Sequence, residues 1–198
     1  MEDLSHKTIH KEKIRTAIVE AARQLLEKEG WENVSIRKIA ERIGYSLPMV
    51  YTHFENKEAI QKEFVKQGFN LLTDHIVTQT ALETEPAQQL IALSAAYFDF
   101  SFSHACYYRL MFGLGIPSCQ QVNEIGEIKR FTSTIFEVLR KLVPAATDER
   151  IFLKFHTLWS VLHGLASISM VNMTGAADTL QKQVLLDAVK GFIKNIND

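Results

Sequence analysis

The sequence predicts an all-α protein with a small helical domain followed by a larger one. Apolar residues recur at helical spacing throughout the chain, and no segment shows the alternation of apolar and polar residues that is typical of a strand. The 198 residues include only 9 glycines and 4 prolines, a low share that predicts few turns and long helices. With 46% hydrophobic and 23% charged residues, the composition is that of a globular protein.

The first two predicted helices span residues 8–29 and 36–43. In the first, Ile14, Ile18, Ala21 and Leu25 lie on one face, and Gly30 follows as a stop. The second is amphipathic, with Ser35 in position to cap its start and Gly44 at its end. Its apolar face contains Ile36, Ile39, Ala40 and Ile43.

A short third helix is predicted from Ser46, its expected cap, through Phe54. Pro48 falls in its first turn, where a missing N–H does no harm. Two turns are marginal alone, so we expect Val50 and Phe54 to hold this helix against the first two. The short helix, glycine turn and short helix predict a helix-turn-helix, after which Asn56 caps a fourth helix.

Longer and more apolar helical segments are predicted beyond residue 56. Breaks at Pro86, at 113–117, at Pro144 with the Thr147 cap, and at Thr174-Gly175 separate them. The expected domains are therefore 8–56, which contains the helix-turn-helix, and 57–198. The segments of the second domain are 57–82, 86–103, 106–113, 121–142, 148–173 and 179–196.

The net charge of −1 gives no argument for nucleic acid from bulk basicity. Two cysteines, Cys106 and Cys119, are too few for a secreted disulfide framework, and a polar segment follows Met1, so we expect a cytoplasmic protein. Residues 155–177 lack Asp, Glu, Lys and Arg but carry eight His, Ser, Thr or Asn side chains. We therefore expect a core or interface helix rather than a membrane span.

Residues 34–60 resemble the DNA-binding region of TetR-family transcriptional regulators. The resemblance rests on the ordered combination of Ser-x-x-x-Ile-Ala, the glycine of the turn, and Tyr-x-His-Phe-x-x-Lys, about thirty residues from the N-terminus. It implies a homodimer that binds a double-stranded, pseudo-palindromic DNA operator with its third helix in the major groove.

On the exposed face of the third helix, Leu47, Pro48, Met49 and Thr52 are the candidate base readers. Because they are mostly apolar, recognition is expected to use thymine methyls, water and DNA shape. Arg37 suits either a guanine edge or a phosphate, or is a solvated charge. By resemblance, the residues that hold the phosphate backbone are Ser35, Tyr51, His53 and Lys57.

The second domain is expected to bind a small-molecule effector. The segment 97–112, with Trp159, His163 and Gly164, resembles the TetR subset that has a Trp-His-Gly signature. An apolar or amphipathic effector is expected, because the candidate lining lacks clustered Arg or Lys. Aromatic and Met residues at helical spacing are more often plain core than ligand contacts. The candidate ligand residues are Phe98, Phe102, Tyr108, Met111, Phe112, Trp159, His163 and Met170, with Tyr97 beside them.

Two features relate to assembly and coupling. The charge-free run 155–177 and the stripe Leu185, Val189, Phe192 and Ile196 are expected to pair two subunits in a four-helix bundle. Gly68 inside the fourth helix is either a hinge or a point of close helix packing.

No metal-ligand spacing, P-loop, dinucleotide fingerprint or nucleophile elbow occurs, so we expect no enzyme, no catalytic residue, no metal and no cofactor. The sequence thus predicts a ligand-responsive transcriptional regulator, a repressor released from its operator by the effector. The alternative is a helical module that binds a small molecule without binding an operator.

Overall fold

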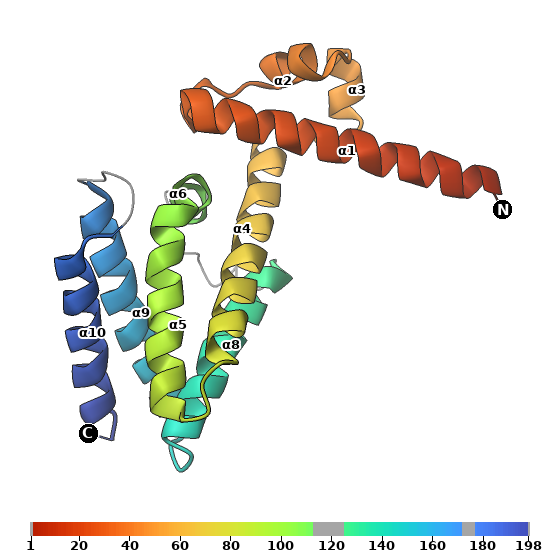
Figure 1. Ribbon diagram of the computed structural model, residues 1–198. Coiled ribbons are helices and arrows are strands. Elements are labelled where there is room, and N and C mark those ends of the chain that lie inside the picture. Colours follow the sequence, from red (N-terminus) through yellow and green to blue (C-terminus); the bar gives the residue numbers. More distant parts are fainter. Residues whose placement is uncertain (1, 113–124, 172–176, 198) are drawn as a thin grey trace. The chain divides into compact units, whose positions relative to one another are not determined.

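The structure is a computed structural model that describes the backbone of residues 2–112, 125–171 and 177–197. It divides into two compact units, Met1–Val65 and Lys66–Asp198. No strand occurs in the described part of the chain, so the prediction of an all-α fold is confirmed. Figure 1 shows the helices of both units.

The N-terminal unit contains α1 (Glu2–Glu29), a 3-10 turn η1 (Trp31–Asn33), α2 (Ile36–Ile43), α3 (Leu47–Tyr51) and the first turns of α4 (Lys57–Thr80). Helix α1 packs against η1 and α2, and α2 packs against α3. Ile18, Ile39, Val50 and Ile60, one from each of the four helices, are completely buried. This core joins helices that are too short to be stable alone.

The C-terminal unit contains the rest of α4, α5 (Pro86–Ser103), α6 (Ala105–Phe112), α8 (Gly126–Leu142), α9 (Asp148–Val171) and α10 (Thr179–Lys194). Helix α5 is central, because it packs against α6, α8, α9 and α10 (Figure 1). The fully buried aromatic residues of this unit are Phe69, Tyr97, Phe98, Phe100 and Phe131.

Most predicted helix ends that glycine or capping chemistry marked are confirmed. Gly30 and Gly44 adopt φ of 77° and 70°, which favour glycine, directly after α1 and α2. Asn56 Oδ1 accepts from Ala59 N at 2.8 Å at the start of α4, and Thr147 Oγ1 accepts from Arg150 N at the start of α9.

The predicted side-chain cap at Ser46 is wrong. Ser46 stands at the start of α3, but its hydroxyl makes no capping bond. The residue two positions on is Pro48, which has no N–H, and the N–H of Met49 is already bound to the Ser46 carbonyl at 3.0 Å. No donor is left for the hydroxyl.

Several helix limits also differ from the prediction. Helix α3 ends at Tyr51 rather than Phe54, because His53 N bonds to Val50 O, three residues back, at 3.0 Å. Helix α4 likewise ends at Thr80, helix α10 at Lys194, and α8 begins at Gly126. Helix α1 begins at Glu2, since no glycine or proline interrupts residues 2–7. The predicted limits 113, 121 and 173 lie outside the described residues.

One described helix, Asp148–Met170 within α9, is long and apolar enough to cross a membrane by length and composition alone, with a mean hydropathy of 1.2. Such a helix is weak evidence for a membrane span, because core helices pass the same test. Ile151, Phe155, Leu158 and Leu162 of α9 are buried inside the unit. This agrees with the expected core or interface helix.

Candidate functional site

Hydrogen bonds at both ends of α2 fix the helix-turn-helix. The Ser35 hydroxyl accepts from Lys38 N at 3.3 Å, and Tyr45 N donates to the Ala40 carbonyl at 3.1 Å across Gly44. The first bond caps the start of α2, and the second closes its end, where the chain turns at Gly44 and continues into α3. The Ser35 hydroxyl, predicted to bind phosphate, is therefore also a structural cap.

The candidate base readers lie on the outer side of α3. Leu47 has 41% of its surface exposed; Pro48 and Thr52 are also exposed, whereas Met49 is half-buried. Val50 on the opposite face is fully buried, as predicted. The Thr52 hydroxyl donates to the Met49 carbonyl at 2.7 Å, which leaves its oxygen lone pairs as acceptors. This surface offers methyl groups and few hydrogen-bond donors.

Arg37 and Tyr51 are two exposed candidates for contact with DNA. Tyr51 is 53% exposed. The Arg37 side chain is 79% exposed, and its Nε lies 3.0 Å from Glu41 Oε1, one helical turn on. An exposed pair of this kind contributes little to stability, so exchanging Glu41 for a phosphate costs little.

His53 is half-buried, and its Nδ1 is buried without a hydrogen-bond partner in the part of the chain that the structure describes. The pKa of His53 is lowered, chiefly by burial and then by the positive charges of Lys11 and Arg15. The imidazole is therefore neutral at pH 7.

Lys57 is turned inward more than its predicted role as a phosphate contact requires. Its Nζ donates to the Trp31 carbonyl at 2.7 Å and lies 4.9 Å from the centre of the Trp31 ring. The ring of Trp31 in turn packs edge-on against Phe64. The ammonium thus ties the start of α4 to η1, although two of its three N–H groups remain for other acceptors.

Sequence reasoning missed Arg15 of α1. Its guanidinium contacts three groups: the His53 carbonyl, Glu63 and the ring of Phe54. Its hydrogen-bond partners are 38 and 48 residues away in sequence, and no local pattern signals contacts at such separation.

In the C-terminal unit, the structure brings Tyr108, Phe112, Trp159 and His163 together around Tyr97. The ring centres of Tyr108 and Phe112 are 4.7 Å apart, and those of Phe112 and His163 are 4.9 Å apart. Phe98 and Phe102 form a separate pair at 5.1 Å. Four of the eight predicted ligand residues therefore form one cluster.

Hydrogen bonds connect the residues of this cluster. Trp159 Nε1, which only donates, bonds to the Tyr97 hydroxyl at 3.3 Å. The Tyr97 hydroxyl lies 3.1 Å from that of Tyr108, which lies 2.7 Å from His163 Nδ1. His163 Nε2 lies 3.5 Å from Ser167 Oγ. The Tyr97 hydroxyl also lies 3.3 Å from His163 Nδ1, so both tyrosine hydroxyls are within hydrogen-bond distance of this one nitrogen.

Burial shifts the pKa values in the cluster so that every group stays neutral. It raises the pKa of Tyr108 to about 12 and that of Tyr97 well above its usual value, and it lowers the pKa of His163. The cluster therefore offers hydroxyl and imidazole hydrogen bonds but no charge.

The other predicted ligand residues lie elsewhere in the unit. Phe98 lines a cavity of about 190 Å³ between α5 and α10, whose rim carries Asp99 and Lys182, 3.7 Å apart. Met111 packs on α4 at Gly68, where an added Cβ would overlap Met111 Sδ. Met170 is half-buried. Close packing, rather than freedom of the backbone, therefore explains Gly68.

The fold and the exposed α3 face define a helix-turn-helix protein with a helical C-terminal unit. Residues 18–64 match the family described as bacterial regulatory proteins, tetR family, and residues 90–189 match the tetracyclin repressor-like C-terminal domain. Because the second match alone covers half of the chain, the chain belongs to the TetR family. The matched families and relatives are transcriptional regulators, not enzymes.

Two relatives and one structure illustrate the match. The chain is 28% identical over 91 residues to the uncharacterized regulator YobS of Bacillus subtilis, covering 46% of this chain and 47% of YobS, about half its length. It is 26% identical over 156 residues to the activator FasR of Mycolicibacterium smegmatis, covering 79% of this chain and 68% of FasR. A protein of unknown function from Rhodococcus sp. RHA1 shares the fold, with a TM-score of 0.75, 22% identity, and 91% and 93% of the two chains covered.

Proposed function

We propose that this protein is a ligand-responsive transcriptional regulator that binds a pseudo-palindromic DNA operator as a homodimer. The observation that carries this proposal is the exposed face of α3, a helix fixed by α2 and presenting Leu47, Pro48 and Thr52 to solvent. The major groove of B-DNA admits one such helix. This role places the protein in the cytoplasm, with the operator as its partner.

The proposed contacts sort into two groups. Leu47, Pro48, Met49 and Thr52 read base edges and thymine methyls, because they stand on the outer side of α3. Arg37 reaches a guanine edge or a phosphate by leaving Glu41. The phosphate backbone is held from the start of α2, the end of α3, the turn that follows and the start of α4, by Ser35, Tyr51, His53 and Lys57.

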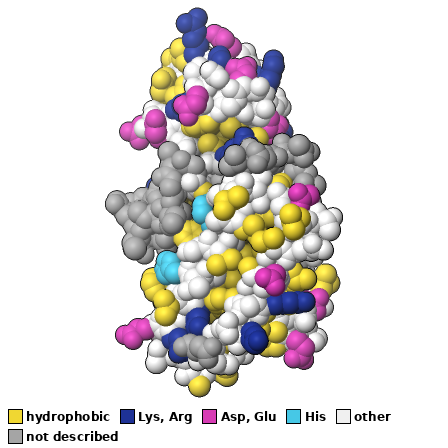
Figure 2. Space-filling view, turned by 90° about the vertical axis from the view of Figure 1, so that its left-hand side faces the viewer, with side chains coloured by type: hydrophobic (Ala, Val, Ile, Leu, Met, Phe, Trp, Pro, Cys, Tyr) yellow, Lys and Arg dark blue, Asp and Glu magenta, His cyan; other side chains and the backbone are white. Residues whose placement is uncertain are grey.

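The proposed homodimer pairs α9 and α10 of two subunits. Exposed apolar side chains remain on both helices: Leu153, Val161 and Ile168 on α9, and Leu180 and Val184 on α10. Figure 2, which shows the face that carries these helices, has hydrophobic side chains between few charged groups. Pairing would bury this surface. The stripe expected from the sequence is wrong, because Leu185, Val189 and Ile196 are buried within the subunit.

The proposed effector is apolar or amphipathic and binds in the C-terminal unit. The cluster around Tyr97 supplies aromatic walls and uncharged hydrogen-bonding groups, and burial keeps these groups neutral by raising the pKa of both tyrosines. Helix α4 belongs to both units, so it is the element through which ligand and operator oppose each other. We propose repression with release by the effector, although FasR is by name an activator.

Selection of DNA from a random library with the purified protein tests the function. A pseudo-palindromic site with half-sites about 10 base pairs apart is expected, and binding should fall steeply with salt, by roughly 0.9 in the log–log slope for each phosphate neutralised. No enrichment would favour the module that binds only a small molecule. A reporter gene under the selected site then gives the sign of regulation.

A further inference from the structure

We propose that Arg15 is a positioning residue for DNA binding. It fixes the turn between α3 and α4, residues 52–56, and so holds Tyr51 and His53 in position for the phosphate backbone and Thr52 in position for the base edges. The inference rests on the proposed function, because it assigns a role relative to those contacts.

One guanidinium holds three elements of the N-terminal unit together. Arg15 of α1 donates from Nη1 to the His53 carbonyl at 3.2 Å and from Nη2 to Glu63 Oε2 of α4 at 2.7 Å. Its Cζ lies 4.2 Å from the centre of the Phe54 ring, and Phe54 is 3% exposed. The planar fork of arginine allows these contacts to be made at the same time.

The turn needs an external support because α3 is short. Helix α3 consists of only five residues, Leu47–Tyr51. The carbonyl groups after its last turn find no N–H donor within the helix. Arg15 gives the His53 carbonyl a charged donor. The side chain of His53 and the two residues before it are proposed DNA contacts, so the position of this carbonyl sets the position of all three.

The geometry does not suit Arg15 as a phosphate contact itself. Glu63 neutralises its charge, and its side chain is 36% exposed against 79% for Arg37. A positioning residue and a phosphate contact differ in a measurable way. Only loss of a phosphate contact changes the salt dependence of binding, by about 0.9 in the log–log slope per phosphate.

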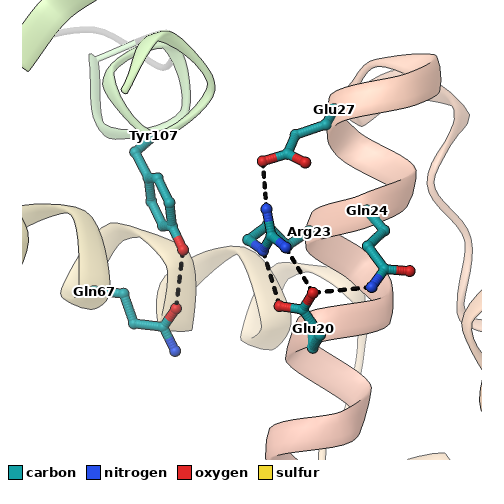
Figure 3. Close-up of polar contacts among 6 residues, drawn as sticks. All are labelled: Glu20, Arg23, Gln24, Glu27, Gln67 and Tyr107. Carbon is teal, nitrogen blue, oxygen red and sulfur yellow. Dashed lines mark hydrogen bonds and ion pairs between the residues drawn. The ribbon is translucent and has the colours of Figure 1, made fainter. Parts of the chain in front are cut away.

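Arg23 is a matched control on the same helix. It is also paired with acidic side chains, Glu20 at 2.6 Å and Glu27 at 2.5 Å, but both belong to α1 (Figure 3). Its side-chain hydrogen bonds also stay on α1 within the described residues. Arg23→Met removes the same charge and the same fork from α1 while leaving the turn untouched.

The experiment compares the full-length wild type, Arg15→Met, Glu63→Gln, the double variant and Arg23→Met. The probe is a labelled duplex of the site that the wild type enriches from a random library, titrated at several salt concentrations. Far-UV circular dichroism and thermal unfolding show whether each variant is folded at the temperature of the titration.

Arg15→Met is expected to weaken binding about tenfold, the usual size of a lost hydrogen bond to a charged group, with the salt slope unchanged. Arg23→Met should bind as the wild type does. Glu63→Gln should weaken binding in the same direction, and the double variant should be no weaker than Arg15→Met, because both residues act through one contact.

Three results would overturn the inference. The first is equal binding by Arg15→Met and the wild type. The second is a shallower salt slope for Arg15→Met, which would make Arg15 a phosphate contact. The third is additive losses in the double variant, which would separate Arg15 from Glu63. Failure of the wild type to enrich any DNA would instead overturn the proposed function, and this inference with it.

Discussion

Trp159 donates to Tyr97 in the aromatic cluster, because an indole N–H can only donate. The Tyr97 oxygen accepts from it, and the acceptors within reach of the Tyr97 proton are the Tyr108 hydroxyl at 3.1 Å and His163 Nδ1 at 3.3 Å. The Tyr108 hydroxyl lies 2.7 Å from the same His163 Nδ1. Protonating His163 would place a donor on Nδ1, and the two tyrosine hydroxyls would lose the acceptor that they share.

Acid should therefore destabilise the protein. The folded pKa of His163 is lowered by burial, as are those of His53 and His104, so below pH about 6.5 the unfolded chain binds more protons than the folded chain. Stability is fully present above that pH and is lost as pH falls toward the folded pKa values. Thermal unfolding from pH 8 to 5 measures this.

His163→Asn isolates the contribution of the cluster. The Asn oxygen can still accept from Tyr108 but does not titrate. The variant should be less stable than the wild type at pH 7.5 and should lose less of its stability on acidification. An equally steep loss would show that His53 and His104 account for the whole effect.

Met49 and Lys57 should differ in what they do to DNA selectivity. Met49→Ala removes an apolar contact at the base edges, so it should change the relative preference among sites. Lys57→Ala should weaken all sites about equally. Library selection with each variant distinguishes the two outcomes, and unchanged preferences for Met49→Ala would remove Met49 from the base readers.

At the scale of elements, the helix ends that glycine and capping residues mark agree with the prediction from the sequence. The helix ends that depend on competition between hydrogen bonds do not. Gly44 and Asn56 act within three or four residues, so their effect is visible in the sequence. Helix α3 ends where the hydrogen bond from His53 N goes to Val50 O, three residues back. Arg15, 38 residues before His53, supports the turn that follows.

The contact between α4 and α6 predicts how a substitution of Gly68 changes the free energy of unfolding. Tyr107 Oη donates to Gln67 Oε1 at 3.3 Å beside it (Figure 3), and Met111 fills the space where a side chain would stand. Gly68→Ala gains about 1 kcal/mol of helix propensity but overpacks the contact at a cost of about 1–3 kcal/mol. We expect a net loss of about 1 kcal/mol in denaturant unfolding.

In the Met111→Ala variant, the effect of Gly68→Ala on the free energy of unfolding should have the opposite sign. With the Met111 side chain shortened, the Cβ added at position 68 has room and only the helix propensity remains, so Gly68→Ala should stabilise that variant by about 0.5–1 kcal/mol. Equal effects in both backgrounds would show that Met111 does not explain the glycine. The Met111→Ala change alone should cost about 2–5 kcal/mol.

At the scale of the whole molecule, α9 and α10 have two apolar sides. Phe155, Leu162 and Leu185 are buried inside the subunit, whereas Ile168 and Leu180 are 72% and 67% exposed. A helix that is apolar on two sides is typical of a core that continues into a partner. This arrangement accounts for the charge-free run in the sequence better than a membrane does.

Ile168→Glu should therefore shift the protein toward monomer and weaken operator binding. The substitution would bury a carboxylate from each subunit in the dimer interface, and burying such an unpaired charge destabilises the dimer. Leu82→Glu is a suitable control, because Leu82 is 74% exposed and follows the end of α4. Sedimentation equilibrium gives the mass of each variant, and a dimeric Ile168→Glu protein would move the interface elsewhere.

The sequence by itself determined the helical class, most helix ends and the helix-turn-helix, because apolar periodicity, glycines and caps act over a few residues. Only the tertiary structure decided which apolar face of α10 is core, that Lys57 binds the Trp31 carbonyl, and that Arg15 supports the α3–α4 turn. These depend on contacts between residues far apart in the chain. Such contacts follow from how whole helices pack, and no local pattern encodes them.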